Sequence, residues 1–183
     1  MDDANDLLRR CQRGDESALA ALVEQFGGRV SRLAFRVLGD RGRAEDASAD
    51  VFVKLWMTAR QWRGDADAGT WIYRVAYHTV LDHQRRKQRR SVAPPVGLMD
   101  PRPGPVELTV QSELEGRAAH RVHEAMSQLS EPDRALVHLY YLEQLTLAQI
   151  AEIIGATREV LKMRLARARQ KLRELLGDDE KLL

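Results

Sequence analysis

The chain has 183 residues, which suits one or two small domains, and its 31% of charged side chains nearly cancel to a net charge of +2. No apolar run approaches the roughly 20 residues that span a membrane, and the acidic N-terminal residues predict no signal peptide. The one cysteine, Cys11, excludes an internal disulfide and a cysteine-based zinc site, while glycine-rich phosphate loops and HExxH are absent. We therefore expect a protein of the reducing cytoplasm that is neither a nucleotide-dependent enzyme nor a zinc hydrolase.

The first predicted long helix follows a clear start signal. Gly14 and Asp15 form a break and an N-cap, and Glu16 lies in the first turn, where the helix dipole favours an acid. Apolar residues then recur every three or four positions over residues 19–38. Gly39 is expected to end this helix.

Two further helices and a loop are predicted before residue 90. The helix of residues 43–60 has one apolar stripe, formed by Ala44, Ala47, Val51, Leu55 and Thr58. Residues 62–69 are rich in Gly and Asp and predict a loop. Thr70 is expected to cap the next helix, which ends in a basic cluster: Arg85, Arg86, Lys87, Arg89 and Arg90.

Residues 91–108 separate two parts of the chain. This stretch holds five of the six prolines, and proline fixes φ and removes a backbone donor. We therefore predict a linker between one domain at residues 1–90 and another at residues 109–183. Because nothing reads as a strand pair, the predicted fold class is all-α, with two small helical domains whose relative placement depends on a partner.

The second part contains a predicted helix-turn-helix. A helix over residues 111–129 is followed by a helix start at Ser130, with Pro132 in its first turn, and by a helix over residues 135–142. The helix-turn-helix itself is punctuated by a cap, a turn glycine and a second cap: Thr146, Gly155 and Thr157.

The final predicted helix has two distinct faces. Its apolar side is formed by Leu161, Leu165, Ala168, Leu172 and Leu175, and the opposite side by Glu159, Val160, Lys162, Met163, Arg167, Gln170 and Arg173. Lys162 and Arg164 suit guanine or phosphate, while Val160 and Met163 suit thymine methyls. The alternative is that Val160 and Met163 pack against another helix or a partner protein. Likewise, both basic clusters fit either polyanion contacts or merely solvated helix faces.

Several runs of the sequence resemble one family. These runs are residues 44–52, 54–56, 62–86, 129–156 and 161–175. They resemble regions 2 and 4 of group IV, or extracytoplasmic-function (ECF), sigma factors of bacterial RNA polymerase, in the family's order and with a proline-rich stretch in place of region 3. The resemblance implies a non-catalytic protein that directs core polymerase to promoters, is held by an anti-sigma factor and needs no cofactor or metal.

The resemblance also implies roles for individual residues. The helix with Asp46, Asp50, Phe52, Val53, Leu55 and Trp56 would dock on the β′ coiled coil. The −10 element would be recognised and melted by Arg63, Asp65, Thr70, Trp71, Arg74, Tyr77, His78, Arg85, Arg86, Lys87, Arg89 and Arg90. The −35 element would be read by Thr157, Arg158, Glu159, Val160, Lys162, Met163, Arg164 and Arg167, and the outer surface of the same domain would hold the β flap.

Each of these roles has a plainer alternative. Asp46 and Asp50 also fit ordinary exposed helix acids, and Trp71, Tyr73 and His78 also fit buried core residues. The sequence departs from the family pattern at Ala49 for a usual glutamine, at His78 for a usual asparagine, and at Ala68 or its neighbour for a usual aromatic. The run from Glu159 to Leu165 lacks the family's usual threonine and serine, which indicates an unusual promoter sequence or weaker phosphate anchoring.

Other functions receive little support from the sequence. His120 and His123 lie three residues apart and form at most a weak metal pair. The acids Glu45, Asp46 and Asp50 have no matching second cluster that would suggest a nuclease. A stand-alone helix-turn-helix regulator and a protein-only adaptor or anti-sigma decoy remain the alternatives to a sigma factor.

Overall fold

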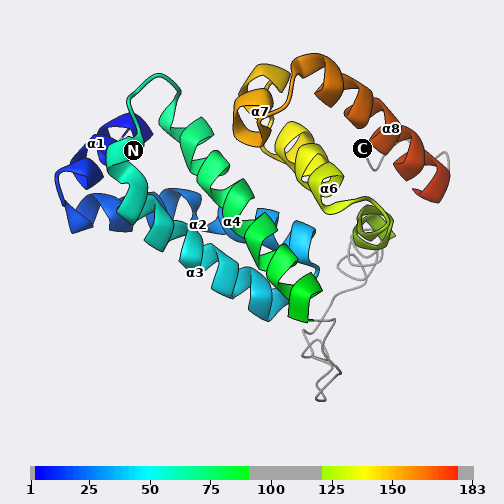
Figure 1. The fold of residues 1–183 in the computed structure, drawn as a ribbon, viewed down its shortest axis with the longest axis horizontal. Helices are drawn as coiled ribbons and strands as arrows, with labels where there is room; N and C mark the ends of the chain where they lie inside the picture. The colour runs from blue at the N-terminus through cyan, green and yellow to red at the C-terminus, as the bar shows by residue number, and fades with distance from the viewer. Residues whose placement is uncertain (1–2, 91–120, 177–183) are drawn as a thin grey trace, which may run out of the picture.

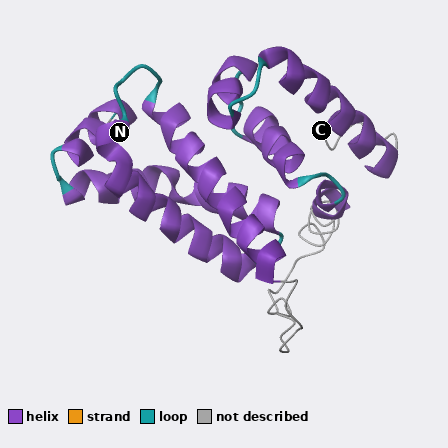
Figure 2. Cartoon of the chain, viewed as in Figure 1, coloured by secondary structure: helices purple, strands orange, loops and turns teal. Residues whose placement is uncertain are grey.

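The computed structural model describes residues 3–90 and 121–176 (Figure 1). Within these ranges the regular structure is helical, and no strand occurs (Figure 2). The helices form two groups that lie side by side, one from each described range. The predicted all-α fold class is therefore confirmed for the described part of the chain, while the predicted linker at 91–108 lies outside it.

The first group contains four α-helices and one short 3₁₀ helix: α1 (Ala4–Gln12), α2 (Glu16–Leu38), α3 (Arg41–Thr58), η1 (Ala59–Gln61) and α4 (Ala68–Arg90). The predicted limits of α2 are confirmed. The Asp15 carboxylate accepts from the N–H groups of Ser17 and Ala18, and Gly39 adopts a φ of +68° at the C-terminal end. Helix α3 begins at Arg41, two residues before its predicted start, because the Asp40 side chain caps it.

The cap of α4 differs from the prediction. The helix begins at Ala68, and the Asp67 carboxylate accepts from the N–H groups of Gly69 at 2.9 Å and Thr70 at 3.4 Å. Thr70 is itself buried, with 3% of its surface exposed. A Cβ on Gly69 would lie only 2.9 Å from Asp67 Oδ2, so glycine suits this tight turn. Asp67, and not Thr70, is therefore the residue that caps α4.

The second group contains the helical residues 121–127, followed by α6 (Glu131–Val137), the π-helical η2 (His138–Leu142), α7 (Leu147–Ile154) and α8 (Arg158–Leu176). The start of the predicted 111–129 helix lies outside the described residues. The predicted helix at 135–142 is instead the end of α6 followed by the π turn.

The helix-turn-helix is confirmed in the structure. Thr146 and Gln149 form a reciprocal capping box at the start of α7, and Gly155 makes the turn with a φ of +75°. The Thr157 hydroxyl accepts from the N–H of Val160 and so caps α8. These local signals hold α7 and α8 in the arrangement that presents the start of α8 outward.

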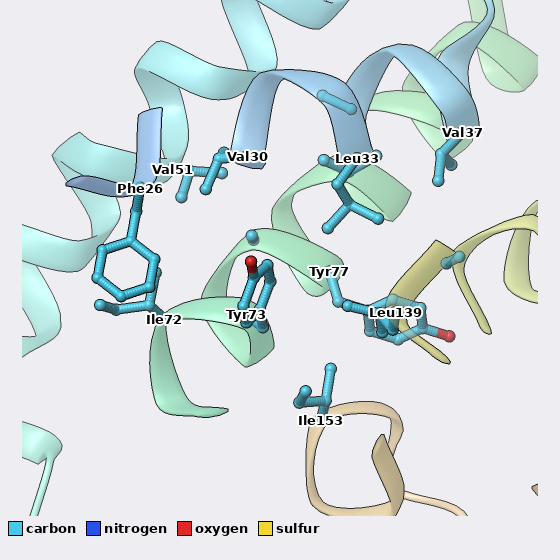
Figure 3. Packing of buried hydrophobic residues seen from close by; sticks show 14 of the residues in the cluster. Phe26, Val30, Leu33, Val37, Val51, Ile72, Tyr73, Tyr77, Leu139 and Ile153 are labelled. Atoms are coloured by element: carbon cyan, nitrogen blue, oxygen red, sulfur yellow. The ribbon is translucent and has the colours of Figure 1, made fainter. Parts of the chain in front are cut away.

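One buried cluster extends through both helix groups. Helices α2 and α4 pack against α6 and α7, and the packing draws apolar side chains from both sides (Figure 3). Tyr73 and Tyr77 from α4 belong to this cluster together with Leu139 and Ile153 of the second group. The proline-rich stretch at 91–108 predicted two separate domains, so this shared core is a finding of the structure.

Candidate nucleic-acid and polymerase interfaces

One face of α4 combines an aromatic side chain with basic residues. Trp71, Arg74, His78 and Arg85 follow one another at spacings of three, four and seven residues, which places them on the same side of the helix. Arg74, His78 and Arg85 are exposed, and Trp71 is half-buried against the core. An aromatic surface beside cations is the combination that binds unstacked bases and a phosphate backbone.

His78 lies on this exposed face, so the alternative that it is a buried core residue is wrong. Partial burial, and after it the nearby Arg74 guanidinium, lower the pKa of His78 below its usual value of 6.5. The imidazole is therefore neutral at pH 7, with one ring nitrogen as a donor and the other as an acceptor. It can offer both to a base edge, as an asparagine side chain does.

Two residues predicted to contact the −10 element are not available on this face. Thr70 is buried in the turn at the start of α4, and Tyr77 is 5% exposed. Tyr77 lies on the side of α4 that packs into the shared core, where burial raises its pKa. The prediction that Thr70 and Tyr77 touch DNA is therefore wrong for this arrangement of the helices. The side chains of Lys87, Arg89 and Arg90 lie outside the described residues.

The loop of residues 62–67 presents two predicted −10 contacts. Arg63 and Asp65 are exposed on either side of Gly64, which has a φ of +83°. Trp62 is buried beneath the loop, and its indole N–H donates to the Ala66 carbonyl at 2.9 Å. The loop thus folds around its own tryptophan and holds its charged side chains outward.

Helix α3 carries the predicted polymerase contacts. Asp46 and Val53 are exposed, while Phe52, Trp56 and Asp50 are partly buried. Asp50 Oδ2 lies 2.8 Å from His83 Nε2 on α4, so this acid also joins α3 to α4.

Leu55 and Met57 change the predicted composition of this face. Leu55 is fully buried and anchors α3 in the core, so its assignment to a polymerase contact is wrong. Met57 was missed, although it is 75% exposed and follows Val53 by one helical turn. The sequence could have indicated this exposure, because Met57 is an apolar residue of α3 that does not belong to the predicted buried stripe.

The outward face of α8 agrees with the face predicted from its sequence. Val160 and Met163 are 46% and 56% exposed, which is unusual for apolar side chains of this size. They lie among exposed polar and charged residues: Thr157, Arg158, Glu159, Lys162 and Arg167. The alternative that Val160 and Met163 pack against another helix of the described chain is therefore wrong.

Two predictions on α8 need correction. Arg164 is only partly exposed, and its guanidinium nitrogens Nε and NH2 lie 2.8 and 2.7 Å from Asp133 Oδ1. This side chain braces α8 on α6, so its prediction as a free DNA contact is wrong for this arrangement. Leu175 was predicted on the buried side of α8 but is 46% exposed. Leu176 is buried in its place.

A buried carboxylate lies between the two helix groups. Glu143, just after η2, accepts a hydrogen bond from the Tyr73 hydroxyl of α4, and its Oε2 lies 4.0 Å from Arg29 Nε of α2. Its Oε1 is 3.2 Å from Nε2 of the fully buried His138, without the geometry of a hydrogen bond. Burial alone raises the pKa of Glu143, but His138 and Tyr73 outweigh it and hold that pKa below its usual value. The next residue, Gln144, has a strained φ of +54°.

The described residues offer no assembled metal site. No group of three or more His, Cys, Asp or Glu side chains in residues 3–90 and 121–176 is placed to hold a metal ion. His123 stacks on Phe35 with ring centroids 5.2 Å apart, and His120 lies outside the described residues. In the same part of the chain, no helix is long and apolar enough to cross a membrane.

Comparisons with known proteins agree with this division into two helix groups. Residues 22–90 match the family Sigma-70 region 2, and residues 125–174 match the family Sigma-70, region 4. The ECF RNA polymerase sigma factor SigW of Bacillus subtilis is 24% identical, over 93% of this chain and 95% of that protein. SigK of Mycobacterium ulcerans, also an ECF sigma factor, is 28% identical, over 96% of this chain and 94% of that protein.

Two solved structures share the fold. CnrH in complex with the cytosolic domain of CnrY has a TM-score of 0.71 and 22% identity, over 98% of this chain and all of that chain. The sigma factor RpoE in complex with the anti-sigma factor NepR, from Bartonella quintana, has a TM-score of 0.70 and 19% identity, over 88% and 98% of the two chains. Both regions of one family are matched in their proper order, across well over half of the residues. The chain therefore belongs to the sigma-70 family of RNA polymerase sigma factors, within its extracytoplasmic-function group.

Proposed function

We propose that this chain directs core RNA polymerase to a particular set of promoters in the cytoplasm and performs no catalytic step itself. Residues 1–90 dock on the β′ coiled coil and recognise and melt the −10 element. Residues 91–108 link them to residues 109–183, which read the −35 element and hold the β flap. The observation that carries this proposal is the outward face of α8, where exposed Val160 and Met163 accompany Lys162 at the start of the second helix of a helix-turn-helix.

We also propose that an anti-sigma factor holds the chain until a signal releases it. The similar structures of CnrH and RpoE contain the partners CnrY and NepR, and NepR is an anti-sigma factor. The shared core of the two helix groups covers Tyr73 and Tyr77 of α4. We therefore propose that the groups separate when the chain joins core polymerase, so that each can reach its own promoter element.

Binding to promoter duplex with and without core polymerase tests this function. A sigma factor of this kind binds the duplex specifically only in the presence of core enzyme, and substitutions in the −35 and −10 elements each weaken that binding. Specific binding by the free chain, unchanged by core polymerase, would instead identify a stand-alone helix-turn-helix regulator. Binding to core polymerase without any promoter preference would identify a protein-only adaptor.

A further inference from the structure

Helix α1 contacts both ends of the loop of residues 62–67, although it precedes residue 22, where the match to Sigma-70 region 2 begins. Asn5, Arg9 and Gln12 follow one another at spacings of four and three residues, so they share one face of α1. The other side of α1 packs into the core through the buried side chains of Leu7, Leu8 and Cys11. The polar face of α1 is thus held in a fixed position beside the loop.

Gln12 contacts the start of the loop. Its Nε2 donates to the Ala59 carbonyl at 3.0 Å and to the Trp62 carbonyl at 2.7 Å. Ala59 is the first residue of η1 and Trp62 directly follows its last, and the Ala59 carbonyl also accepts from the Trp62 N–H at 3.1 Å. One amide group therefore fixes the path of the chain as it enters the loop.

Asn5 contacts the other end of the loop. Its Oδ1 accepts from the Ala68 N–H at 3.0 Å, which is one of the first N–H groups of α4 and lacks a partner within the helix. Its Nδ2 lies 3.5 Å from Oδ1 of Asp67, the cap of α4. Between the two ends, the Arg9 guanidinium lies 5.9 Å from the centre of the Trp62 ring, a cation–π distance.

We infer that Asn5, Arg9 and Gln12 form a clamp that positions the loop of residues 62–67 and so helps to set the −10 specificity of the protein. We call these three residues the α1 clamp. This inference rests on the proposed function, because it assumes that Arg63 and Asp65 meet the promoter. The clamp residues act through the loop and touch no DNA; they are positioning residues. The two hydrogen-bonded ends define where the exposed tip of the loop lies relative to the DNA face of α4.

Gln12→Glu tests the clamp with little change in side-chain volume. The carboxylate cannot donate to the two carbonyls, so the start of the loop loses its contacts while α1 keeps its packing. Asn5→Ala tests the other end independently. Gln61→Ala is the matched control, since Gln61 is an exposed glutamine beside the loop without a described side-chain hydrogen bond.

Two measurements are needed. Amide hydrogen exchange of the free chain should show faster exchange over residues 62–68 in Gln12→Glu and Asn5→Ala than in the wild type and Gln61→Ala. Transcription by reconstituted holoenzyme on a library of −10 variants should show discrimination reduced by roughly tenfold at one or more positions, with −35 discrimination unchanged.

The outcomes separate the clamp from the proposed function. Unchanged exchange over residues 62–68 in both variants would overturn the clamp, and so would faster exchange with unchanged −10 discrimination. A wild-type holoenzyme that shows no promoter preference would overturn the proposed function, while the exchange measurement would still report on the contacts of α1.

Discussion

Replacing Glu143 by alanine should loosen the packing between the two helix groups. The carboxylate is almost completely buried and is contacted from α4, from α2 and from its own group. Truncation leaves the Tyr73 hydroxyl without an acceptor, in a side chain that is only 3% exposed. The change therefore removes a polar contact at a buried position where water cannot replace it, and it acts on the face of α4 that the second group covers.

The size of the effect follows from these partners. An orphaned buried hydroxyl costs about 1–3 kcal/mol, and the loss of the charge beside buried His138 adds to it. Arg29 is 54% exposed, so its 4.0 Å ion pair with Glu143 contributes at most about a few tenths of a kcal/mol to stability. We expect Glu143→Ala to lower the free energy of unfolding by about 2–4 kcal/mol. Glu143→Gln should lower it by about 1 kcal/mol, because its amide oxygen still accepts from Tyr73.

Urea unfolding followed by circular dichroism measures the loss, and small-angle X-ray scattering of the free chain measures the separation of the groups. Glu152→Ala is the matched control, since Glu152 is exposed on α7. The expected result is a lower unfolding midpoint and a larger radius of gyration for Glu143→Ala only. Wild-type values of both quantities in Glu143→Ala would show that this carboxylate does not hold the groups together.

The same contact predicts a pH dependence. The pKa of Glu143 is lowered in the folded chain, so the stabilisation by its carboxylate is present above the usual value of 4.5 and is lost as the pH falls through the lowered folded value. Burial, and then Glu143, raise the pKa of Tyr73, whose contribution is therefore present below the usual value of 10.0 and is lost at higher pH. The stability difference between the wild type and Glu143→Gln should shrink as the pH falls below the usual value of 4.5 and through the lowered pKa of Glu143.

Three further predictions concern promoter binding by the holoenzyme. Neutralising Arg85 or Arg86 should reduce the slope of log K against log salt by about 0.9 on duplex or about 0.7 on single strand for each real phosphate contact. An unchanged slope for both variants would mean that Arg85 and Arg86 contact solvent and no phosphate. His78→Asn should shift the −10 base preference while binding to core polymerase is retained; identical preferences would remove His78 from the base-reading surface. Met163→Ser should change the preference at one −35 position by about 1–3 kcal/mol, as measured by transcription on a −35 library. An unchanged preference together with weaker anti-sigma binding would assign Met163 to the protein partner.

Local chemistry made much of the fold predictable. Asp15, Gly39, Thr146 and Gly155 act within a few residues of their own positions, so the ends that they define could be predicted from the sequence. The start of α4 could not, because Asp67 and Thr70 are both capping residues and the choice depends on the turn at Gly69. In that turn, the carboxylate of Asp67 is the group that reaches the free N–H groups.

Contacts between helices determine whether several of the misassigned residues are buried or exposed. Leu175 and Leu176 lie at similar angles on either flank of the apolar stripe of α8, and only the neighbouring helices select Leu176 for burial. Tyr77 was predicted to contact DNA, and a tyrosine fits either an exposed or a buried position. The spacing of apolar residues in α4 does not indicate that its side of the helix meets a second group of helices. Leu55 is different, because its helical spacing predicted burial correctly, whereas the family resemblance placed it among the polymerase contacts.

Run-off transcription with purified core polymerase on candidate promoters, including the promoter of the gene that encodes this chain, tests the proposed function most directly. A sigma factor should give a discrete transcript that appears only when the chain and core polymerase are both present, and that disappears when the −10 or the −35 element is replaced. Core polymerase that starts no transcript at any of these promoters, together with specific duplex binding by the chain alone, would contradict the proposed function.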